Sequence, residues 1–291
     1  MIKLTRDKRR NRTLIFLLFV LIFTGCTNLG LKSKPASVPE VRPGILAPYL
    51  PVPSIPNSMT LLPPPPAAGS AAAQLDEDIR RKYEAQRGSA RWNLAAQDAE
   101  LDFPLAAGTF TCAMNIRISE QDTPYLYRIL RRSFTDAIIS TLKAKNHYKR
   151  IRPFAAHNTS TCSPGWEKDL KNDGSYPSGH SAIGWTWALI LSEIDPEHGD
   201  AILARGRAFG ESRLACNVHW SSDVVEGRFM ASAVVARLHT SPDFLADLKA
   251  AKAEVAAVRG KGPGPTRNCA EEAAALSPGP VSAPSEPPLK K

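Results

Sequence analysis

Residues 174–196 read GSYPSGHSAIGWTWALILSEIDP, and the fold class can be inferred from this stretch. Residues 181–194 are almost wholly apolar, and a helix that is apolar on every side is normally buried. Ser178 is a residue type that caps helix N-termini, and Pro196 cannot continue a helix. The stretch therefore predicts a central, buried helix over residues 181–194.

Helical patterns surround this stretch on both sides. Between residues 124 and 145, apolar side chains recur at spacings of three and four, as they do along one face of a helix. Alternating patterns typical of strands are nearly absent. We therefore predict an all-α protein with a single compact helical domain. Further helices are expected at residues 74–87, 201–215, 221–238 and 242–258.

Prolines mark both ends of this helical region. The chain has 291 residues and 25 prolines, of which eleven lie between Pro35 and Pro66 and seven between Pro263 and Pro288. Proline-rich segments of this kind form semi-rigid spacers. We expect a linker over residues 27–66, the helical domain over residues 67–259 and a disordered tail over residues 260–291.

The first 26 residues have the features of an export signal. Residues 1–12 are basic, and ten apolar residues follow at 14–23, too few to cross a bilayer, which takes about 20. Thr24-Gly25-Cys26 resembles the bacterial lipobox, whose cysteine is lipidated after cleavage. Phe23 stands where leucine is usual, so ordinary signal-peptidase cleavage is the alternative. We expect lipidation at Cys26 and a periplasmic protein anchored to the outer membrane.

The basic charge is too local to indicate a nucleic-acid partner. Of the formal net charge of +9, residues 1–12 contribute +5, which leaves +4 for the rest of the chain. A charge this small does not indicate a surface that binds polyanions. No nucleic-acid partner is therefore expected.

Three short segments hold most of the residues that could carry chemistry. Lys145 and Arg152-Pro153 lie in the first, residues 177–180 form the second, and the third runs from residue 212 to residue 223. Together they contain the patterns K-x6-R-P, P-S-G-H and S-R-x5-H-x3-D, which specify eleven residues in a fixed order. Each segment alone has an ordinary interpretation, as a helix start, a surface ion pair or solvated charges. The complete set in order is far more specific than a single short motif.

The residue types in these segments suit the binding of an anion and attack on it. A helix N-terminus favours negative charge, and Gly179 lets an anion approach the backbone N–H groups closely. The guanidinium of Arg152 matches phosphate oxygens, while Lys145 offers a point charge. Asp223 follows His219 by four residues, so it can bind one ring nitrogen and leave the lone pair of the other free. A histidine oriented in this way is a better nucleophile.

The combined pattern resembles the phosphatidic acid phosphatase type 2 (PAP2)/vanadium haloperoxidase superfamily. Within it, Arg91-Trp92, residues 174–181 and Leu238-His239-Thr240 are similar to the bacterial class A non-specific acid phosphatases. The likeness covers about residues 60–258, and Ser181 stands where threonine is commoner. The resemblance implies the helical fold of this superfamily and acid hydrolysis of a broad range of phosphate monoesters.

The resemblance also implies a role for each motif residue. His219 matches the nucleophile that becomes phosphohistidine, and Asp223 matches the carboxylate that orients it. His180 matches the general acid that protonates the leaving alkoxide and then assists water. Cationic side chains take the place of divalent ions in such a site, so no metal and no other cofactor is expected. The implied phosphate-binding residues are Lys145, Arg152, Ser178, Gly179 and Arg213.

The four cysteines after the signal favour structural disulfides, because an exported chain meets an oxidising compartment. Their spacing shows no C-x-x-C pair and no zinc-like pattern, and it leaves three pairings open. Cys162 and Cys216 flank the second and third motifs, so a bridge between them that braces the site is our hypothesis. Cys269 lies in the expected tail, where a free thiol would also be unsurprising. The remaining cysteine is Cys112.

Other functions share part of this evidence. Vanadate mimics phosphate, so the motif residues also fit a vanadate-dependent haloperoxidase. A lipid phosphatase is disfavoured because the multiple membrane spans usual in that branch are not expected here. A non-catalytic phosphate-binding lipoprotein is disfavoured by the intact His180, His219 and Asp223. The expected partners are small phosphorylated substrates, the membrane only through a lipid anchor at Cys26 and, by family likeness alone, further copies of the chain.

Overall fold

The computed structural model describes residues 35–277 of the chain. The expected export signal and Cys26 lie outside the described residues, as does the C-terminal part of the expected tail. Within residues 35–277 the secondary structure is helical apart from a hairpin of two short strands, β1 (Glu40–Arg42) and β2 (Ile45–Leu46). The prediction of an all-α fold is confirmed.

The long helices agree closely with the periodicity of the sequence. α10 (Ser221–Leu238) and α11 (Pro242–Val258) begin and end where predicted, while α2 (Ala71–Glu84) begins earlier because the Ser70 hydroxyl caps it. None of the helices in the described part of the chain is long and apolar enough to cross a bilayer. The other helices and helical turns are η1 (Val52–Ser54), α1 (Ser58–Leu61), α3 (Ala90–Gln97), η2 (Leu105–Phe110), α4 (Thr111–Met114), α5 (Pro124–Tyr148), α6 (Pro153–Ala156), η3 (Pro164–Trp166), α7 (Glu167–Asn172), α8 (Gly179–Ile194), η4 (Pro196–His198), α9 (Gly199–Ala215) and α12 (Cys269–Leu276).

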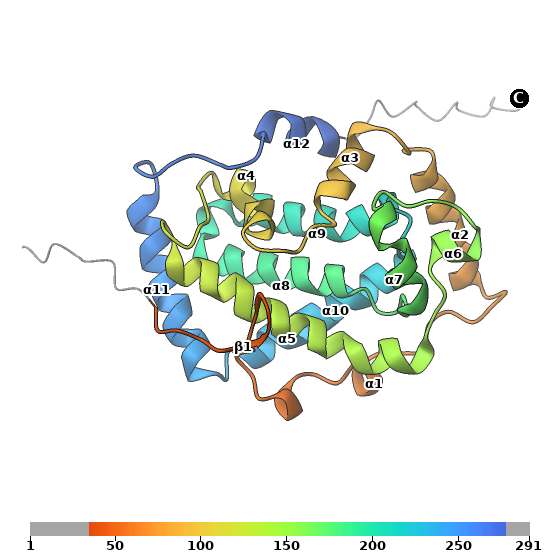
Figure 1. The fold of residues 1–291 in the computed structure, drawn as a ribbon, viewed down its shortest axis with the longest axis horizontal. Helices are drawn as coiled ribbons and strands as arrows, with labels where there is room; N and C mark the ends of the chain where they lie inside the picture. Colours follow the sequence, from red (N-terminus) through yellow and green to blue (C-terminus); the bar gives the residue numbers. More distant parts are fainter. Residues whose placement is uncertain (1–34, 278–291) are drawn as a thin grey trace, which may run out of the picture. The chain divides into compact units, whose positions relative to one another are not determined.

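Helix α8 lies at the centre and packs against α5, α9 and α10 (Figure 1). Most of its side chains are buried, and the buried indole of Trp187 donates to the carbonyl of Leu130 at 2.9 Å. Its close packing against α9 requires a glycine, because a Cβ on Gly206 would lie 2.2 Å from the Cβ of Ala188. The predicted central, buried helix is therefore confirmed.

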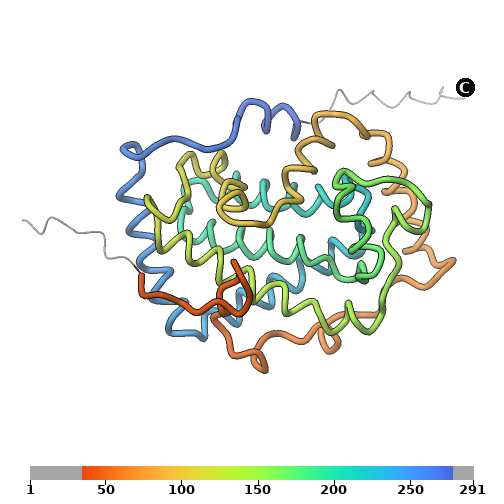
Figure 2. The backbone as a smooth tube through the Cα atoms, in the orientation of Figure 1, coloured from red at the N-terminus to blue at the C-terminus, as the bar shows by residue number. Residues whose placement is uncertain are grey.

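Residues 35–66 pack against the helices, although their proline content predicts a linker over residues 27–66. Tyr49 and Leu50 are buried, and their backbone N–H groups donate to the two oxygens of Asp136 in α5 at 2.9 and 3.0 Å. The Tyr49 phenol donates to Asp247 in α11 at 2.7 Å. Figure 2 shows this red to orange segment beside the helix that Figure 1 labels α5. Side-chain anchors, rather than a ladder of backbone bonds, hold the proline-rich segment on the helices.

Residues 260–277 are likewise packed, although they belong to the expected disordered tail. Cys269, at the start of α12, forms a disulfide with Cys112 in α4. Arg267 reaches the buried Asp98, with Nη1 3.1 Å from Oδ1. The covalent bond and the buried ion pair together hold this segment in place. The second disulfide joins Cys162 to Cys216, which confirms the predicted pairing of these two cysteines.

Candidate active site

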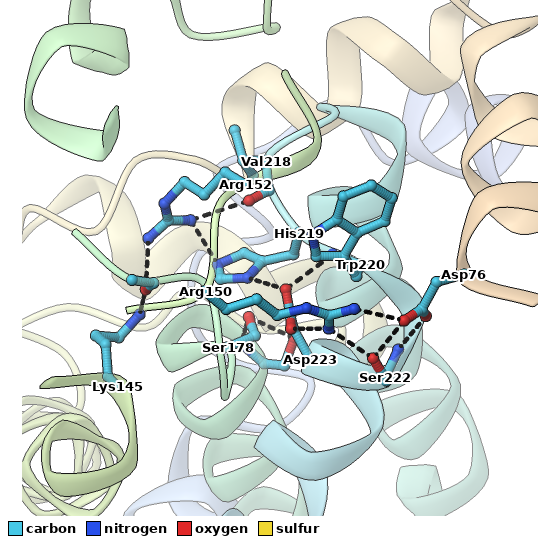
Figure 3. A network of polar contacts seen from close by, with 12 residues as sticks. Asp76, Lys145, Arg150, Arg152, Ser178, Val218, His219, Trp220, Ser222 and Asp223 are labelled. Atoms are coloured by element: carbon cyan, nitrogen blue, oxygen red, sulfur yellow. Dashed lines mark hydrogen bonds and ion pairs between the residues drawn. The ribbon is translucent and has the colours of Figure 1, made fainter. Parts of the chain in front are cut away.

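The three motif segments meet beside the N-terminus of α8 (Figure 3). Lys145 lies in the last turn of α5, and Arg152 immediately precedes α6. Arg213 lies in the last turn of α9, and Asp223 lies in the first turn of α10. The remaining motif residues of the site are Ser178, Gly179 and His180 at the start of α8 and His219 just before α10.

Ser178 is the N-cap of α8, as the sequence predicts. Its hydroxyl oxygen accepts from the Ser181 N–H at 3.2 Å and from the Ser181 hydroxyl at 2.9 Å, which leaves its own proton to donate elsewhere. The Ser178 N–H donates to the carbonyl of Asp223 at 2.9 Å. This contact between α8 and α10 needs Gly227, because a Cβ there would lie 2.4 Å from the Ser178 carbonyl oxygen.

His219 lies between Arg152 and Asp223, and the two contacts define its tautomer (Figure 3). Its Nε2 lies 3.0 Å from Arg152 Nη1, and because a guanidinium can only donate, Nε2 carries a lone pair. Its Nδ1 lies 3.2 Å from Asp223 Oδ2 and donates its proton to that carboxylate. The structure therefore contains the geometry that the four-residue spacing suggests.

The surroundings of His219 favour the neutral form of its ring. Burial lowers the pKa of His219 well below its usual range, and the positive charges of Arg152 and Lys145 lower it further. Only 3% of the side chain is exposed. A neutral ring keeps the Nε2 lone pair available in acidic solution, where an exposed histidine would be protonated.

Lys145 and Arg152 converge on the carboxylate of Asp173. Asp173 Oδ2 lies 2.8 Å from Arg152 Nη2 and 3.4 Å from Lys145 Nζ. Arg152 is fixed by the carbonyls of Leu170 and Val218, each 3.0 Å away. Two cations that converge on one carboxylate can also converge on a phosphoryl group. Asp173 lies outside the motif, so sequence reasoning did not find it.

Arg213 provides a third cation. Its Nη2 donates to the carbonyl of Ala95 at 2.6 Å, while its Nε is buried without a hydrogen-bond partner within the described residues. A buried donor without an acceptor is costly, and a phosphate oxygen would satisfy it.

Burial lowers the pKa of Lys145 to about 8, with the charge of Arg152 acting in the same direction. A dianion bound between these groups would stabilise all of their positive charges.

His180, the second residue of α8, donates from Nε2 to the carbonyl of Ala99 at 3.1 Å. This bond leaves Nδ1 as the ring atom that can carry a proton to a substrate. Burial lowers the pKa of His180 well below its usual range, and the charge of Arg213 adds to the effect. His180 and Arg213 line the same cavity of about 220 Å³.

A buried polar network behind Asp223 was missed by sequence reasoning. Arg150 donates from Nη1 to Asp223 Oδ1 at 2.6 Å and from Nη2 to Asp76 Oδ2 at 2.8 Å. Ser222 donates from its hydroxyl to Asp76 at 2.7 Å. Burial raises the pKa of Asp223, and the ion pair with Arg150 acts against that rise. Position 150 lies two residues before Arg152 in an extended segment, and this spacing is the one signal that could have found it.

Comparisons with known proteins show the family of this chain. The family model of the PAP2 superfamily matches residues 125–245. A non-specific acid phosphatase of Providencia stuartii is 42% identical over 204 residues, which cover 70% of this chain and 82% of that protein. One from Salmonella typhimurium is 38% identical over 200 residues, which cover 68% and 80% of the two chains. A crystal structure of a bacterial vanadium-dependent iodoperoxidase matches at 18% identity with a TM-score of 0.43, over 70% of this chain and 62% of that one, which is too distant to bear on function.

Both relatives are more than 30% identical to this chain, and each match covers more than two thirds of both proteins. The chain belongs to the bacterial class A non-specific acid phosphatases, within the PAP2 superfamily.

Proposed function

We propose that the chain is an exported acid phosphatase that hydrolyses a broad range of phosphate monoesters through a phosphohistidine at His219, without a metal ion. The observation that carries this proposal is the state of His219. Asp223 binds the proton on Nδ1, and Nε2 presents a lone pair among cationic side chains. Family membership supports the phosphatase class, and this geometry supports the choice of nucleophile.

In the first step, His219 Nε2 attacks phosphorus while the bond from phosphorus to the ester oxygen breaks. Arg152 gives up its contact with Nε2 and turns to the phosphoryl oxygens. Fixed cations and N–H donors around the transferring group stabilise its charge. His180 protonates the leaving oxygen from Nδ1, so the alcohol departs as a neutral molecule. The other groups that bind the phosphoryl oxygens are Lys145, Ser178, the Gly179 N–H and Arg213.

In the second step, water attacks phosphorus and the bond from phosphorus to His219 Nε2 breaks. The neutral His180 accepts the proton of the attacking water, which restores it for the next cycle. Asp223 keeps the proton of His219 on Nδ1 throughout, so Nε2 regains its lone pair. An alcohol in place of water would receive the phosphoryl group instead, which makes phosphate transfer the expected side reaction.

The proposal is tested with the full chain and p-nitrophenyl phosphate between pH 4 and 8, in the presence of EDTA. We expect turnover in EDTA that His219→Ala lowers by roughly a thousandfold or more. The matched control is His239→Ala, because His239 is partly exposed and bonds Glu193 at the far ends of α10 and α8 from the site, with Nε2 2.9 Å from Oε2. The control keeps its activity within about twofold. Turnover that EDTA abolishes, or that survives in His219→Ala, contradicts the proposal.

Export to the periplasm and a lipid anchor at Cys26 are part of the same proposal. The disulfides Cys112–Cys269 and Cys162–Cys216 support export, because such bonds persist in oxidising compartments. Incorporation of labelled palmitate into cells that express the full chain tests the anchor. Label is expected in the outer-membrane fraction with the wild-type chain and is lost with Cys26→Ser. An unlabelled wild-type chain contradicts the anchor.

A further inference from the structure

A cavity of about 220 Å³ lies beside the phosphate site. Its lining includes His180 and Arg213, which the proposed function places on the leaving oxygen and on the phosphoryl group. This volume is large enough for one ring system. The cavity is therefore of the right size for the organic part of a small phosphate ester.

The position of His180 determines which part of a substrate enters the cavity. This step rests on the proposed function, in which His180 protonates the leaving oxygen. The group attached to that oxygen then extends from the phosphate toward His180. Leu170 and Val218 belong to the lining and also bind Arg152 through their carbonyls at 3.0 Å, so the cavity adjoins the phosphate-binding residues directly.

Part of the cavity lining is apolar and includes an exposed tryptophan. Leu101, Leu170 and Val218 contribute aliphatic side chains. Trp166 is 57% exposed, in contrast to the fully buried Trp187 of the core. A tryptophan at the rim of a cavity presents a flat apolar face on which a ring can stack. These apolar side chains suit a planar, uncharged group.

The loop that carries Trp166 is held in place although the side chain is exposed. The Trp166 N–H donates to the carbonyl of Ser163 at 3.0 Å, and Glu167 accepts from the Thr161 N–H at 2.7 Å. The disulfide Cys162–Cys216 ties the same loop to the third motif. A wall that is fixed before binding loses little conformational freedom when a ligand stacks on it.

Two acidic residues, Glu100 and Asp102, also belong to the lining. Glu100 Oε1 accepts from the Asp102 N–H at 2.9 Å, which holds the two residues together. A leaving group with its own negative charge would meet these carboxyl groups, and the repulsion weakens as salt screens it. Arg213 belongs to the same lining, but the proposed function engages it with the phosphoryl group, so the two acidic residues favour a leaving group without negative charge.

We propose that this cavity is the leaving-group subsite, in which Trp166 stacks on a planar ring while Glu100 and Asp102 select against negative charge. The favoured substrates are phosphate monoesters of uncharged aromatic alcohols. Short alkyl esters gain nothing from Trp166, and esters with anionic leaving groups are repelled. Trp166 is a specificity residue in this scheme and takes no part in bond making or breaking.

The stacking part is tested with the full chain by kcat/KM for phenyl phosphate and ethyl phosphate in each variant. Comparing each variant with wild type on the same ester cancels the different reactivities of the two esters. Trp166→Leu is expected to lower kcat/KM for phenyl phosphate about fivefold and leave ethyl phosphate within about twofold. Trp166→Phe restores most of the loss. Trp92→Leu is the matched control, because Trp92 does not line the cavity. Its ring packs against Arg87, whose guanidinium carbon lies 4.8 Å from the ring centroid.

The charge part is tested with 4-carboxyphenyl phosphate in the double variant Glu100→Gln/Asp102→Asn. At low salt we expect kcat/KM for this ester to rise about fivefold, while phenyl phosphate stays within about twofold. The gain shrinks at high salt, because screening already weakens the repulsion in the wild type. The same gain for both esters, or no gain for the anionic one, overturns the charge part.

The outcomes separate this inference from the proposed function. If Trp166→Leu changes both esters equally or neither, while hydrolysis still depends on His219, the subsite is wrong and the phosphatase mechanism stands. If the wild-type chain hydrolyses none of the esters, or does so without His219, the proposed function fails and the subsite fails with it.

Discussion

The carboxylate of Asp173 lies 2.8 Å from the guanidinium of Arg152, the same guanidinium that contacts the lone pair of His219. The second cation of the pair, Lys145, lies 3.4 Å from the same carboxylate oxygen. A substrate phosphoryl group must therefore compete with an internal anion for both cations. Because 47% of the Asp173 side chain is exposed, the competing carboxylate can swing into solvent.

Asp173→Asn is expected to strengthen phosphate binding. The amide keeps the shape of the side chain and removes the competing charge, which in a half-exposed ion pair corresponds to roughly fivefold in affinity. The inhibition constant of inorganic phosphate and the KM for phenyl phosphate should both fall by that factor, with kcat within about twofold. Asp169→Asn, an exposed acid of α7, is the control and leaves both constants unchanged. A higher inhibition constant in Asp173→Asn would show that the carboxylate orients the cations instead.

Arg150→Met tests the network behind Asp223. The bond from Arg150 to Asp223 is charge-assisted and contributes about 1.5–3 kcal/mol, so its loss should lower kcat by about 10–100-fold. The pKa of Asp223 should also rise, because Arg150 no longer opposes the effect of burial. The acid limb of the pH–rate profile then moves to higher pH, and Arg150→Lys reverses part of that movement. Arg81→Met, in an exposed ion pair on the same α2 that carries Asp76, is the control. A lower kcat without movement of the acid limb would assign Arg150 a merely structural role.

The alkaline limb of kcat/KM should report His180. Burial and the charge of Arg213 lower its pKa, so the protonated form that serves as general acid is lost as the pH rises through that lowered value. Arg213→Gln removes one of the positive charges, so the pKa of His180 rises and the limb moves to higher pH. Arg213→Lys keeps the charge and should leave the limb in place, although both variants lose rate. If the alkaline limb does not move in Arg213→Gln, His180 is not the general acid that this limb reports. Dividing the kcat/KM of each variant by the wild-type value at the same pH removes the effect of substrate ionisation, which is the same for both proteins.

Asp136→Asn should loosen the proline-rich segment. Asp136 accepts the N–H groups of both Tyr49 and Leu50, and an asparagine offers only one acceptor oxygen. The buried N–H group left without a partner costs about 1–3 kcal/mol of the free energy of unfolding, measurable by chemical denaturation. Asp78→Asn removes only an exposed ion pair and should cost less than about 0.5 kcal/mol. Equal stability of the two variants would mean that the segment is not anchored at Asp136.

The sequence predicts the helices well because their apolar periodicity is strong. The bounds of α10 and α11 coincide with the pattern, and Ser178 caps α8 as its residue type suggests. The packing of residues 35–66 has no such signal, since it depends on isolated residues such as Tyr49 that meet Asp136 from a distant helix. Proline content alone favours a spacer, and only the tertiary contacts reverse that expectation.

The candidate site likewise contains residues that the sequence predicts and residues that it does not. The motif residues can be named from spacing, because each must stand at a fixed point on a helix end or loop. Asp76 could not be named, since it lies among other acids of α2 and gains its meaning only through Arg150. Trp166 and Glu100 reach the same cavity from separate segments, so no local pattern connects them.

Trapping the covalent intermediate tests the nucleophile most directly. The full chain is mixed with phenyl phosphate that carries a label on its phosphoryl group, and the reaction is quenched in alkali within one turnover. Mass spectrometry then identifies the labelled residue. The phosphoryl group is expected on His219, as a phosphoramidate that survives alkali, is lost in acid and does not form in His219→Ala. Label on another residue, or turnover without any covalent phosphate, would contradict the assignment of His219 as nucleophile.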